Sequence, residues 1–86
     1  NEFKKNYKKI KKQGKNINKL KDVIIKLSNG ETLEEKYRNH ALNNNINYYN
    51  CYECHIEPDW LLVYKYLDDE LILLLVATGS HSELFG

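Results

Sequence analysis

The sequence predicts an α+β domain with two layers, in which two N-terminal helices pack on a small antiparallel sheet. Apolar residues recur at helical spacing through the first thirty positions, and short β-prone runs separated by turn residues fill the second half. Helices packed on one face of an antiparallel sheet give this architecture. With 86 residues the chain suits a single domain, 1–86. At this size one core yields only roughly 3–5 kcal/mol of net stability.

The first helix is predicted from Phe3, Tyr7 and Ile10, which lie four and three residues apart and so share one face. Gly14 is expected to end it, because glycine adopts the left-handed conformation that follows many helices. The other positions are rich in lysine, including Lys8 and Lys12. This basic surface could bind RNA phosphates, although a solvated helix face explains the same pattern.

The second helix is expected to begin after Asn16, whose side chain can cap the free backbone amides of the first turn. The Asn-Gly pair at 29–30 ends it. A short helical turn is predicted near 33–37. The apolar face of the second helix consists of Ile17, Leu20, Val23, Ile24 and Leu27.

Three strands are predicted in the second half, at 46–55, 60–67 and 71–78, after a loop of three asparagines at 43–45. Pro58 cannot donate a backbone hydrogen bond, so it marks the turn between the first and second strands. The acidic residues at 68–70 join the last two strands as a hairpin. The last strand is apolar on both faces, which places it in mid-sheet beneath the helices.

Charge divides the chain into two unlike halves. Residues 1–40 hold 12 Lys or Arg and five acidic residues, whereas 41–86 hold one lysine and seven acidic residues, within a net charge of +1. No apolar run approaches the about 18 residues of a membrane span, and the lysine-rich start lacks the apolar segment of a signal peptide. We therefore expect a cytoplasmic protein with no membrane partner.

Two sequence motifs stand out in the second half. The first is His-Ile-Glu-Pro-Asp-Trp at 55–60, followed by Leu-Leu-Val-Tyr, and the second is Thr-Gly-Ser-His-Ser-Glu-Leu-Phe-Gly at 78–86. In order and spacing they resemble the YafQ branch of the RelE-type toxins, the ribosome-dependent mRNA endonucleases of bacterial toxin–antitoxin pairs. The resemblance is strong over 40–86 and weaker over 1–39. It implies a RelE-like two-layer fold.

The resemblance also implies a set of site residues. Cleavage of RNA without a metal needs a base for the 2′-hydroxyl proton, an acid for the leaving oxygen, and a donor for charge on the phosphate. Histidine suits both proton steps near neutral pH. The implied catalytic residues are His40, His55, Asp59, His81 and Phe85. Trp60 and the position of Ala77 are implied on the substrate-binding side, where Lys8 and Lys12 would add phosphate contacts.

Each of these residues also has a plainly structural interpretation. A single histidine is more often a surface or satisfied core residue than a catalyst. Asp59 could simply shape its turn. Phe85 could be core rather than a ring that stacks on a nucleotide base, and core support is the favoured interpretation of Trp60.

The chain departs from the family pattern at three places. Ala77 stands where an arginine usually binds the scissile phosphate, and Tyr52 replaces another common arginine. Losing such a group costs about 2.7–4 kcal/mol in the barrier, so attenuated cleavage is expected, whether Ala77 is a natural weakening or a designed inactivation. The family also has a strand ahead of its first helix. Here that strand has been lost or lies outside this sequence.

The cysteine motif at 51–55, Cys-Tyr-Glu-Cys-His, allows two rival interpretations, a haem site and a zinc site. Cys-x-x-Cys-His attaches c-type haem, and Cys-x-x-Cys forms half of many zinc sites. Strand residues three apart point to opposite faces, so Cys51 and Cys54 would not converge on one metal. We expect free buried thiols, no cofactor and no metal.

Two function classes follow from these patterns. The first is an mRNA endonuclease of the ribosomal decoding site that a cognate antitoxin neutralises and that meets operator DNA only through the antitoxin complex. The second is a non-catalytic module on the same scaffold, which binds antitoxin and operator DNA or a gyrase-type target. The histidines favour the first class, and Ala77 leaves room for the second.

Overall fold

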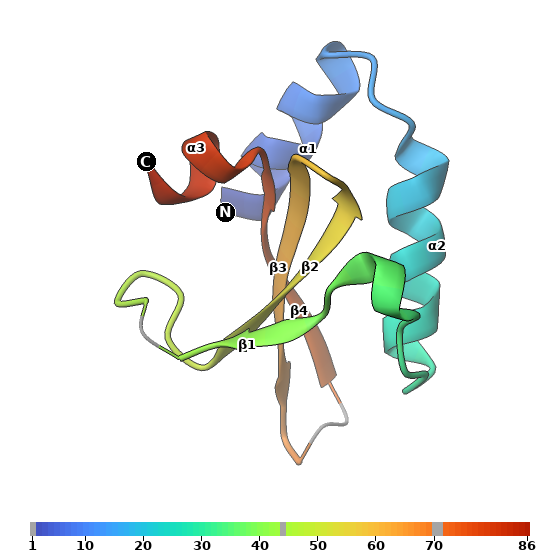
Figure 1. The fold of residues 1–86 in the computed structure, drawn as a ribbon, viewed down its shortest axis with the longest axis vertical. Coiled ribbons are helices and arrows are strands. Elements are labelled where there is room, and N and C mark those ends of the chain that lie inside the picture. The colour runs from blue at the N-terminus through green and yellow to red at the C-terminus, as the bar shows by residue number, and fades with distance from the viewer. Residues whose placement is uncertain (1, 44, 70–71) are drawn as a thin grey trace.

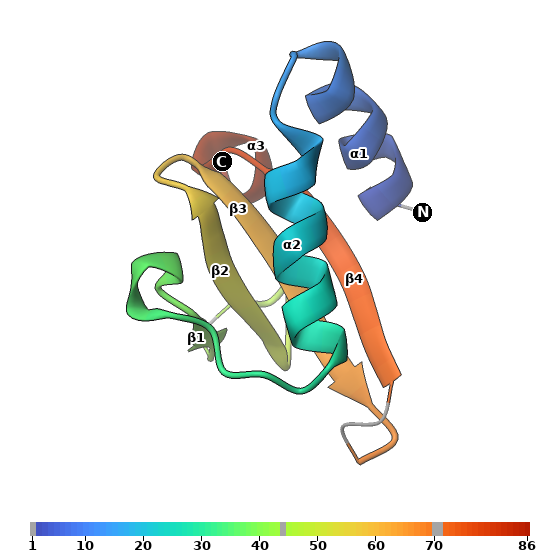
Figure 2. The ribbon, with the colours of Figure 1, turned by 90° about the vertical axis from the view of Figure 1, so that its right-hand side faces the viewer.

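The computed structural model describes residues 2–43, 45–69 and 72–86. In chain order it contains α1 (Glu2–Lys12), α2 (Ile17–Ser28), the short 3-10 helix η1 (Glu35–Tyr37), β1 (His40–Leu42), β2 (Cys51–Glu57), β3 (Trp60–Leu67), β4 (Ile72–Gly79) and α3 (His81–Phe85). The strands form one antiparallel sheet in the order β1-β2-β3-β4. Helices α1 and α2 pack on one face, called here the helix face, and α3 packs on the other, the α3 face (Figures 1 and 2). The predicted α+β fold is confirmed.

Helix α2 forms where its cap and apolar spacing predict it. The side chain of Asn16 accepts a hydrogen bond from the backbone nitrogen of Asn18 at 3.1 Å, and so satisfies an amide of the first turn. Leu20, Val23 and Leu27 are buried against the sheet. In Figure 2 this helix lies in front of the sheet.

The predicted hairpin of the last two strands is confirmed within the described residues. β3 and β4 pair from Leu67 with Ile72 to Leu61 with Gly79. Asp68 and Asp69 both have positive φ, 53° and 54°, the conformation of a tight hairpin turn. The expected turn residue 70 and strand residue 71 lie outside the described residues. The strand expected in mid-sheet, β4, instead lies at one edge of the described sheet, beside β3 and next to α1.

The strand predicted at 46–55 begins only at Cys51, and the prediction for 46–50 is wrong. These residues form turns, although their β-prone side chains suit a strand. The side chain of Asn45 accepts hydrogen bonds from the backbone nitrogens of Asn47 and Tyr48, and Asn50 has a φ of 60°. Asparagine bonds that bend the backbone therefore override the propensity of the residues that follow. Of the loop predicted at 43–45, residue 44 lies outside the described residues.

Two elements were not predicted, β1 and α3. β1 pairs only with the start of β2 and has three residues, too few to show a periodic pattern in the sequence. α3 begins at a reciprocal cap, in which Ser80 and Glu83 each bond the other's backbone nitrogen. The Ser-x-x-Glu word at 80–83 is a recognised start signal and could have revealed this helix.

The sheet separates two apolar cores. Between the sheet and α1 and α2 lies a cluster around Trp60, Leu62 and Tyr64, and under α3 lies a smaller one that contains Leu61 and Val63. This alternation is that of a strand buried on both sides. The two cysteines follow the same rule, Cys51 in the α3-side cluster and Cys54 in the helix-side cluster, and both are free thiols.

Helix α1 ties the two halves of the chain together. Its polar side chains bond to residues that come much later: Glu2 to the hydroxyl of Tyr48, Asn6 to the backbone nitrogen of Thr78, and Lys9 to Glu83. The Asn6 bond satisfies an outward-facing amide on the edge strand β4, which would otherwise be open to another strand. Among the described residues, no helix combines the length and apolarity that crossing a bilayer requires.

Candidate functional site

Three ionisable side chains meet on the α3 face where β1 pairs with β2. His40 lies directly opposite Glu53, and His55 follows Glu53 by two residues, so all three share one face. The Oε1 atom of Glu53 lies 3.3 Å from Nε2 of His55 and 3.7 Å from Nε2 of His40. Only 7% of the Glu53 side chain is exposed. One nearly dry carboxylate is therefore shared by two imidazoles.

Backbone carbonyls fix the other edge of each imidazole. Nδ1 of His40 lies 2.7 Å from the carbonyl oxygen of Arg38, and Nδ1 of His55 lies 3.3 Å from that of Pro58. Carbonyl oxygens only accept, so Nδ1 carries the hydrogen in each bond and Nε2 faces Glu53. A second proton on Nε2 makes a cation beside the carboxylate, the form that can protonate a leaving oxygen.

Asp59 connects the turn between β2 and β3 to α3. Its Oδ1 accepts a hydrogen bond from the backbone nitrogen of His81 at 3.1 Å. This bond holds the first residue of α3 beside the turn that carries Pro58, the partner of His55. The structural interpretation of Asp59 thus has direct support, because its carboxylate positions His81.

Glu83 holds the same helix from its other side. Its carboxylate forms an ion pair with Lys9 and accepts from the backbone nitrogen of Ser80 at 2.8 Å. The Lys9 ammonium, followed by the bonds from Ser80, lowers the pKa of Glu83 to about 2. Near neutral pH Glu83 is therefore ionised and clamps α3 to α1.

Aromatic rings line the end of the α3 face. The centroid of the Phe85 ring lies 5.1 Å from that of His81 and 5.5 Å from that of Tyr48, the latter edge-on. Burial raises the pKa of Tyr48 to about 12, and the adjacent Glu2 carboxylate adds to the effect. Phe85 is half-buried, so one part of its ring packs in the core while another part remains open to a ligand.

The register of the sheet brings His55 and α3 to the same end of the domain. His55 pairs with Leu61, and Leu61 pairs with Gly79, two residues before His81. Neighbouring strands lie about 4.8 Å apart, so this row spans about 10 Å from His55 to Gly79. The Leu84 side chain of α3 packs on the same face as Leu61. His55 and α3 therefore lie on one side of the sheet, as a joint site requires.

Two residues assigned to the substrate side are buried. Trp60 has no exposed surface, lies on the helix face, and donates from Nε1 to Oγ1 of Thr78 at 2.9 Å. Ala77 is likewise fully buried, in the cluster under α3. Trp60 therefore supports the core instead of touching substrate. Ala77 offers a ligand no surface, although it shares a row with Val63 and Glu53, so an arginine there would point to the imidazole face.

The lysines assigned to phosphate binding lie elsewhere. Lys8 and Lys12 are exposed on α1 and do not line the pocket that His55 lines. Tyr52, at the other arginine position, stacks on Tyr64 at a centroid distance of 5.7 Å. The structure does not bring these three residues to the imidazoles.

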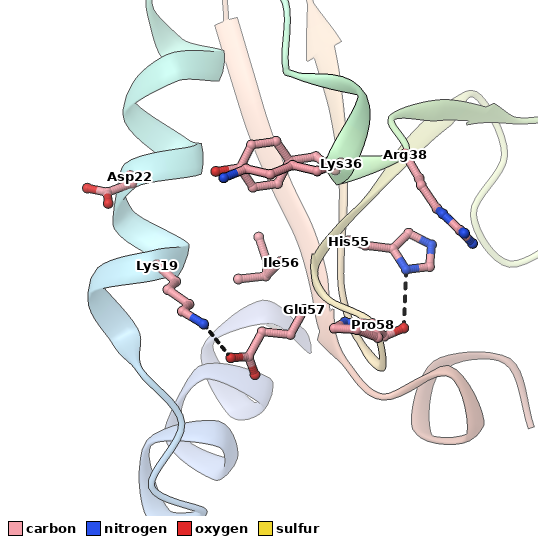
Figure 3. Close-up of a pocket in the computed structure, with 9 residues that line it drawn as sticks. Lys19, Asp22, Lys36, Arg38, His55, Ile56, Glu57 and Pro58 are labelled. Carbon is pink, nitrogen blue, oxygen red and sulfur yellow. Dashed lines mark hydrogen bonds and ion pairs between the residues drawn. The ribbon is translucent and has the colours of Figure 1, made fainter.

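A pocket of about 810 Å³ opens beside His55, between α2, η1 and the β2–β3 turn (Figure 3). Its lining is rich in charge: Lys19, Asp22, Lys36, Tyr37, Arg38, His55, Ile56, Glu57 and Pro58. β1 pairs with β2 only as far as Glu53, so the outer edge of β2 beyond that point is left to η1 and this pocket. Among the described residues, no group of three or more His, Cys, Asp or Glu side chains is placed to hold a metal ion.

Two residues of this region escaped the sequence analysis, Glu53 and Arg38. Glu53 could have been found, because strand residues two apart share a face and His55 was already a candidate. Arg38 gives no such signal. It stands two residues before His40, and only its left-handed backbone, with a φ of 47°, turns the chain from η1 into β1 and brings its side chain to the pocket.

Comparisons with known proteins identify a family and relatives that share the fold of this chain. The family described as bacterial toxin of type II toxin-antitoxin system, YafQ, matches residues 1–86. The mRNA interferase toxin YafQ of Escherichia coli strain B / BL21-DE3 is 37% identical over 99% of this chain and 89% of its own length. A metal-bound toxin from Helicobacter pylori is 39% identical, with a TM-score of 0.87 over 98% of this chain and 91% of its own. An E. coli DinJ-YafQ complex contains a chain 38% identical, with a TM-score of 0.84 over 99% and 91%.

Proposed function

The chain belongs to the YafQ family of bacterial toxins of type II toxin–antitoxin systems, and from this premise we propose that it is an mRNA interferase that cuts mRNA on the ribosome. The observation that carries the proposal is the Glu53 carboxylate shared between His40 and His55, at 3.7 and 3.3 Å. It orients the imidazole of His55, one of the two proton-transfer groups that cleavage of a phosphodiester needs.

The reaction is proposed to use the RNA's own 2′-hydroxyl as nucleophile. One histidine removes its proton, the oxygen attacks the adjacent phosphorus, and a second histidine protonates the 5′-oxygen as its bond to phosphorus breaks. The products are a 2′,3′-cyclic phosphate or its 3′-phosphate, and a 5′-hydroxyl. Imidazoles with one shared carboxylate suit this route, in which no metal-bound water is required.

His55 and His81 are proposed as the proton-transfer pair. They lie at the same end of the α3 face, and the RNA is proposed to lie across that end. Glu53 and Asp59 then act as positioning residues, the first through the imidazoles and the second through the backbone nitrogen of His81. The open part of Phe85, beside His81, is proposed to stack on a nucleotide base.

An antitoxin is the proposed protein partner. The support is the DinJ-YafQ complex, in which a relative of this chain is bound to another protein. Operator DNA is proposed to be met only through that antitoxin complex.

The test is cleavage of a defined mRNA on translating ribosomes, followed by analysis of the RNA ends. We expect 5′-hydroxyl products, and a rate that EDTA leaves unchanged once ribosomes are kept intact by compensating Mg²⁺. Glu53→Gln should lower the rate at least tenfold by removing the negative charge that the two imidazoles share. The matched control, Glu31→Gln, changes an exposed carboxylate outside the pocket that His55 lines and should retain activity. Products with 5′-phosphate ends, or equal rates for both variants, would refute the proposal.

A further inference from the structure

The pocket beside His55 contains three cations, and only one of them is neutralised by a carboxylate. Lys19 is bound to Glu57 at 2.7 Å. Lys36 lies with its ammonium 5.1 Å from the centroid of the Tyr37 ring, a cation–π contact that positions the ammonium without neutralising its charge. Among the described residues, the guanidinium of Arg38 has no hydrogen-bond or ion-pair partner. The positive charges of Lys36 and Arg38 are thus not neutralised by a carboxylate of the pocket.

The acidic residues of the pocket do not offset these two cations. Asp22 is exposed, and in Figure 3 its carboxylate points away from the pocket, on the far side of α2. Glu57 is occupied by Lys19, whose ammonium is the largest cause of its lowered pKa. The pocket lining therefore carries more positive than negative charge, with Lys19, Lys36 and Arg38 against Asp22 and Glu57, which suits an anionic ligand.

Arg38 contacts the imidazole of His40 through its backbone and lines the pocket with its side chain. Its carbonyl oxygen fixes the ring of His40, and its side chain extends past His55, as Figure 3 shows. The left-handed backbone at this residue makes both possible, and for a side chain other than glycine or asparagine it is an uncommon conformation. In Figure 3 the guanidinium lies beside His55, on the side away from α2.

We propose that this pocket is a phosphate-binding subsite for the RNA strand, in which Arg38 supplies the fixed cation that position 77 lacks. The inference rests on the proposed function and adds to it the direction of the strand's path, from α3 across His55 toward η1 and α2. A planar guanidinium binds two phosphate oxygens at once, and Lys36, whose side chain extends toward α2 in Figure 3, adds a point charge at the other end of the pocket. An acidic protein segment is the rival ligand, but His55 lines the same pocket, and that favours the strand whose phosphate the imidazole would serve.

The test uses an uncleavable probe and no ribosome, so that failure of cleavage and failure of this subsite are separable. The probe is a ten-nucleotide single-stranded RNA with 2′-O-methyl riboses, titrated into the full ¹⁵N-labelled chain. We expect amide shifts concentrated at 36–38 and 55–57. Arg38→Gln should lower affinity about fivefold at 0.1 M salt and reduce the slope of log affinity against log salt by about 0.7, the loss of one phosphate contact on a single strand.

Matched variants make the result specific. Arg38→Lys should keep the salt slope of the unchanged chain, since a charge remains, but lose part of the affinity, since an ammonium does not bind two phosphate oxygens in one plane. Arg38→Asn should lose both, although asparagine adopts the left-handed backbone readily. Lys21→Gln, which removes an exposed α2 lysine outside the pocket, should bind RNA within twofold of the unchanged chain. Equal losses for Lys21→Gln and Arg38→Gln, or shifts away from the pocket, overturn the proposal. So does a glutamate-rich peptide that shifts 36–38 when the RNA does not.

Discussion

Removing the Glu83 carboxylate should release α3 and with it His81. In Glu83→Ala the helix loses the bond to the Ser80 nitrogen, 2.8 Å in the structure, and the ion pair with Lys9. The cap is worth about 1 kcal/mol. Water screens the ion pair, whose side chains are 59% and 27% exposed, so it adds only about 0.5 kcal/mol. A total of about 1.5 kcal/mol lowers the melting temperature of a domain this size by about 6–12 °C.

The pH dependence identifies the carboxylate as the cause. Because the folded-state pKa of Glu83 is lowered to about 2 from an ordinary 4.5, its stabilisation is fully present above about pH 5 and is lost as the pH falls toward 2. Urea unfolding should therefore show a gap between the unchanged chain and Glu83→Ala that is widest at pH 7 and narrows by pH 3. Glu31→Ala, which removes a carboxylate with no side-chain bond in the described structure, should leave no gap. A shift below 2 °C at pH 7, or a gap that stays constant with pH, would refute the reasoning.

Three further predictions follow from the same geometry. His81→Ala should lower mRNA cleavage on ribosomes more than His40→Ala, because His81 belongs to the proposed proton-transfer pair and His40 does not. The reverse order would reassign that pair. Trp60→Phe should lower the unfolding free energy by about 1–2 kcal/mol in urea, since a buried indole bond is lost, and leave RNA affinity unchanged; weakened RNA binding would return Trp60 to the substrate side. Burial raises the pKa of Cys51 and raises that of Cys54 to about 12, so neither thiol should react with a disulfide reagent at pH 8 until the chain is unfolded, and rapid reaction of one thiol in the folded chain would contradict this burial.

The sequence predicts those parts of the fold that depend on repeated local patterns. Helix α2 and the β3–β4 hairpin follow from apolar spacing and turn residues. The turn at 46–50 does not, because it depends on the single side chain of Asn45 bonding two backbone amides against the propensity of the residues beside it.

Some residues of the candidate site could likewise be predicted from the sequence, and others could not. The histidines could be named from the resemblance. The carboxylate that joins two of them depends on the pairing of His40 with Glu53, a long-range fact of register. Arg38 depends on one left-handed residue, and no periodicity encodes it. The burial of Trp60 also argues against a substrate contact. The sequence could not decide this, because an aromatic residue beside a catalytic motif can face either the substrate or the interior.

The bonds between α1 and the end of the chain set the order in which this protein can mature. The bond from Asn6 to Thr78 spans 72 residues, and the ion pair of Lys9 with Glu83 spans nearly the whole chain. Contacts of such long sequence separation form late, because the entropy of closing the loop must be overcome before they stabilise anything. While the chain is being synthesised, α1 and α2 can collapse, but α1 cannot pair with α3 until Glu83 has been added. The proposed site therefore forms only after the residues of α3 have been synthesised, because α1 and α3 hold each other in place.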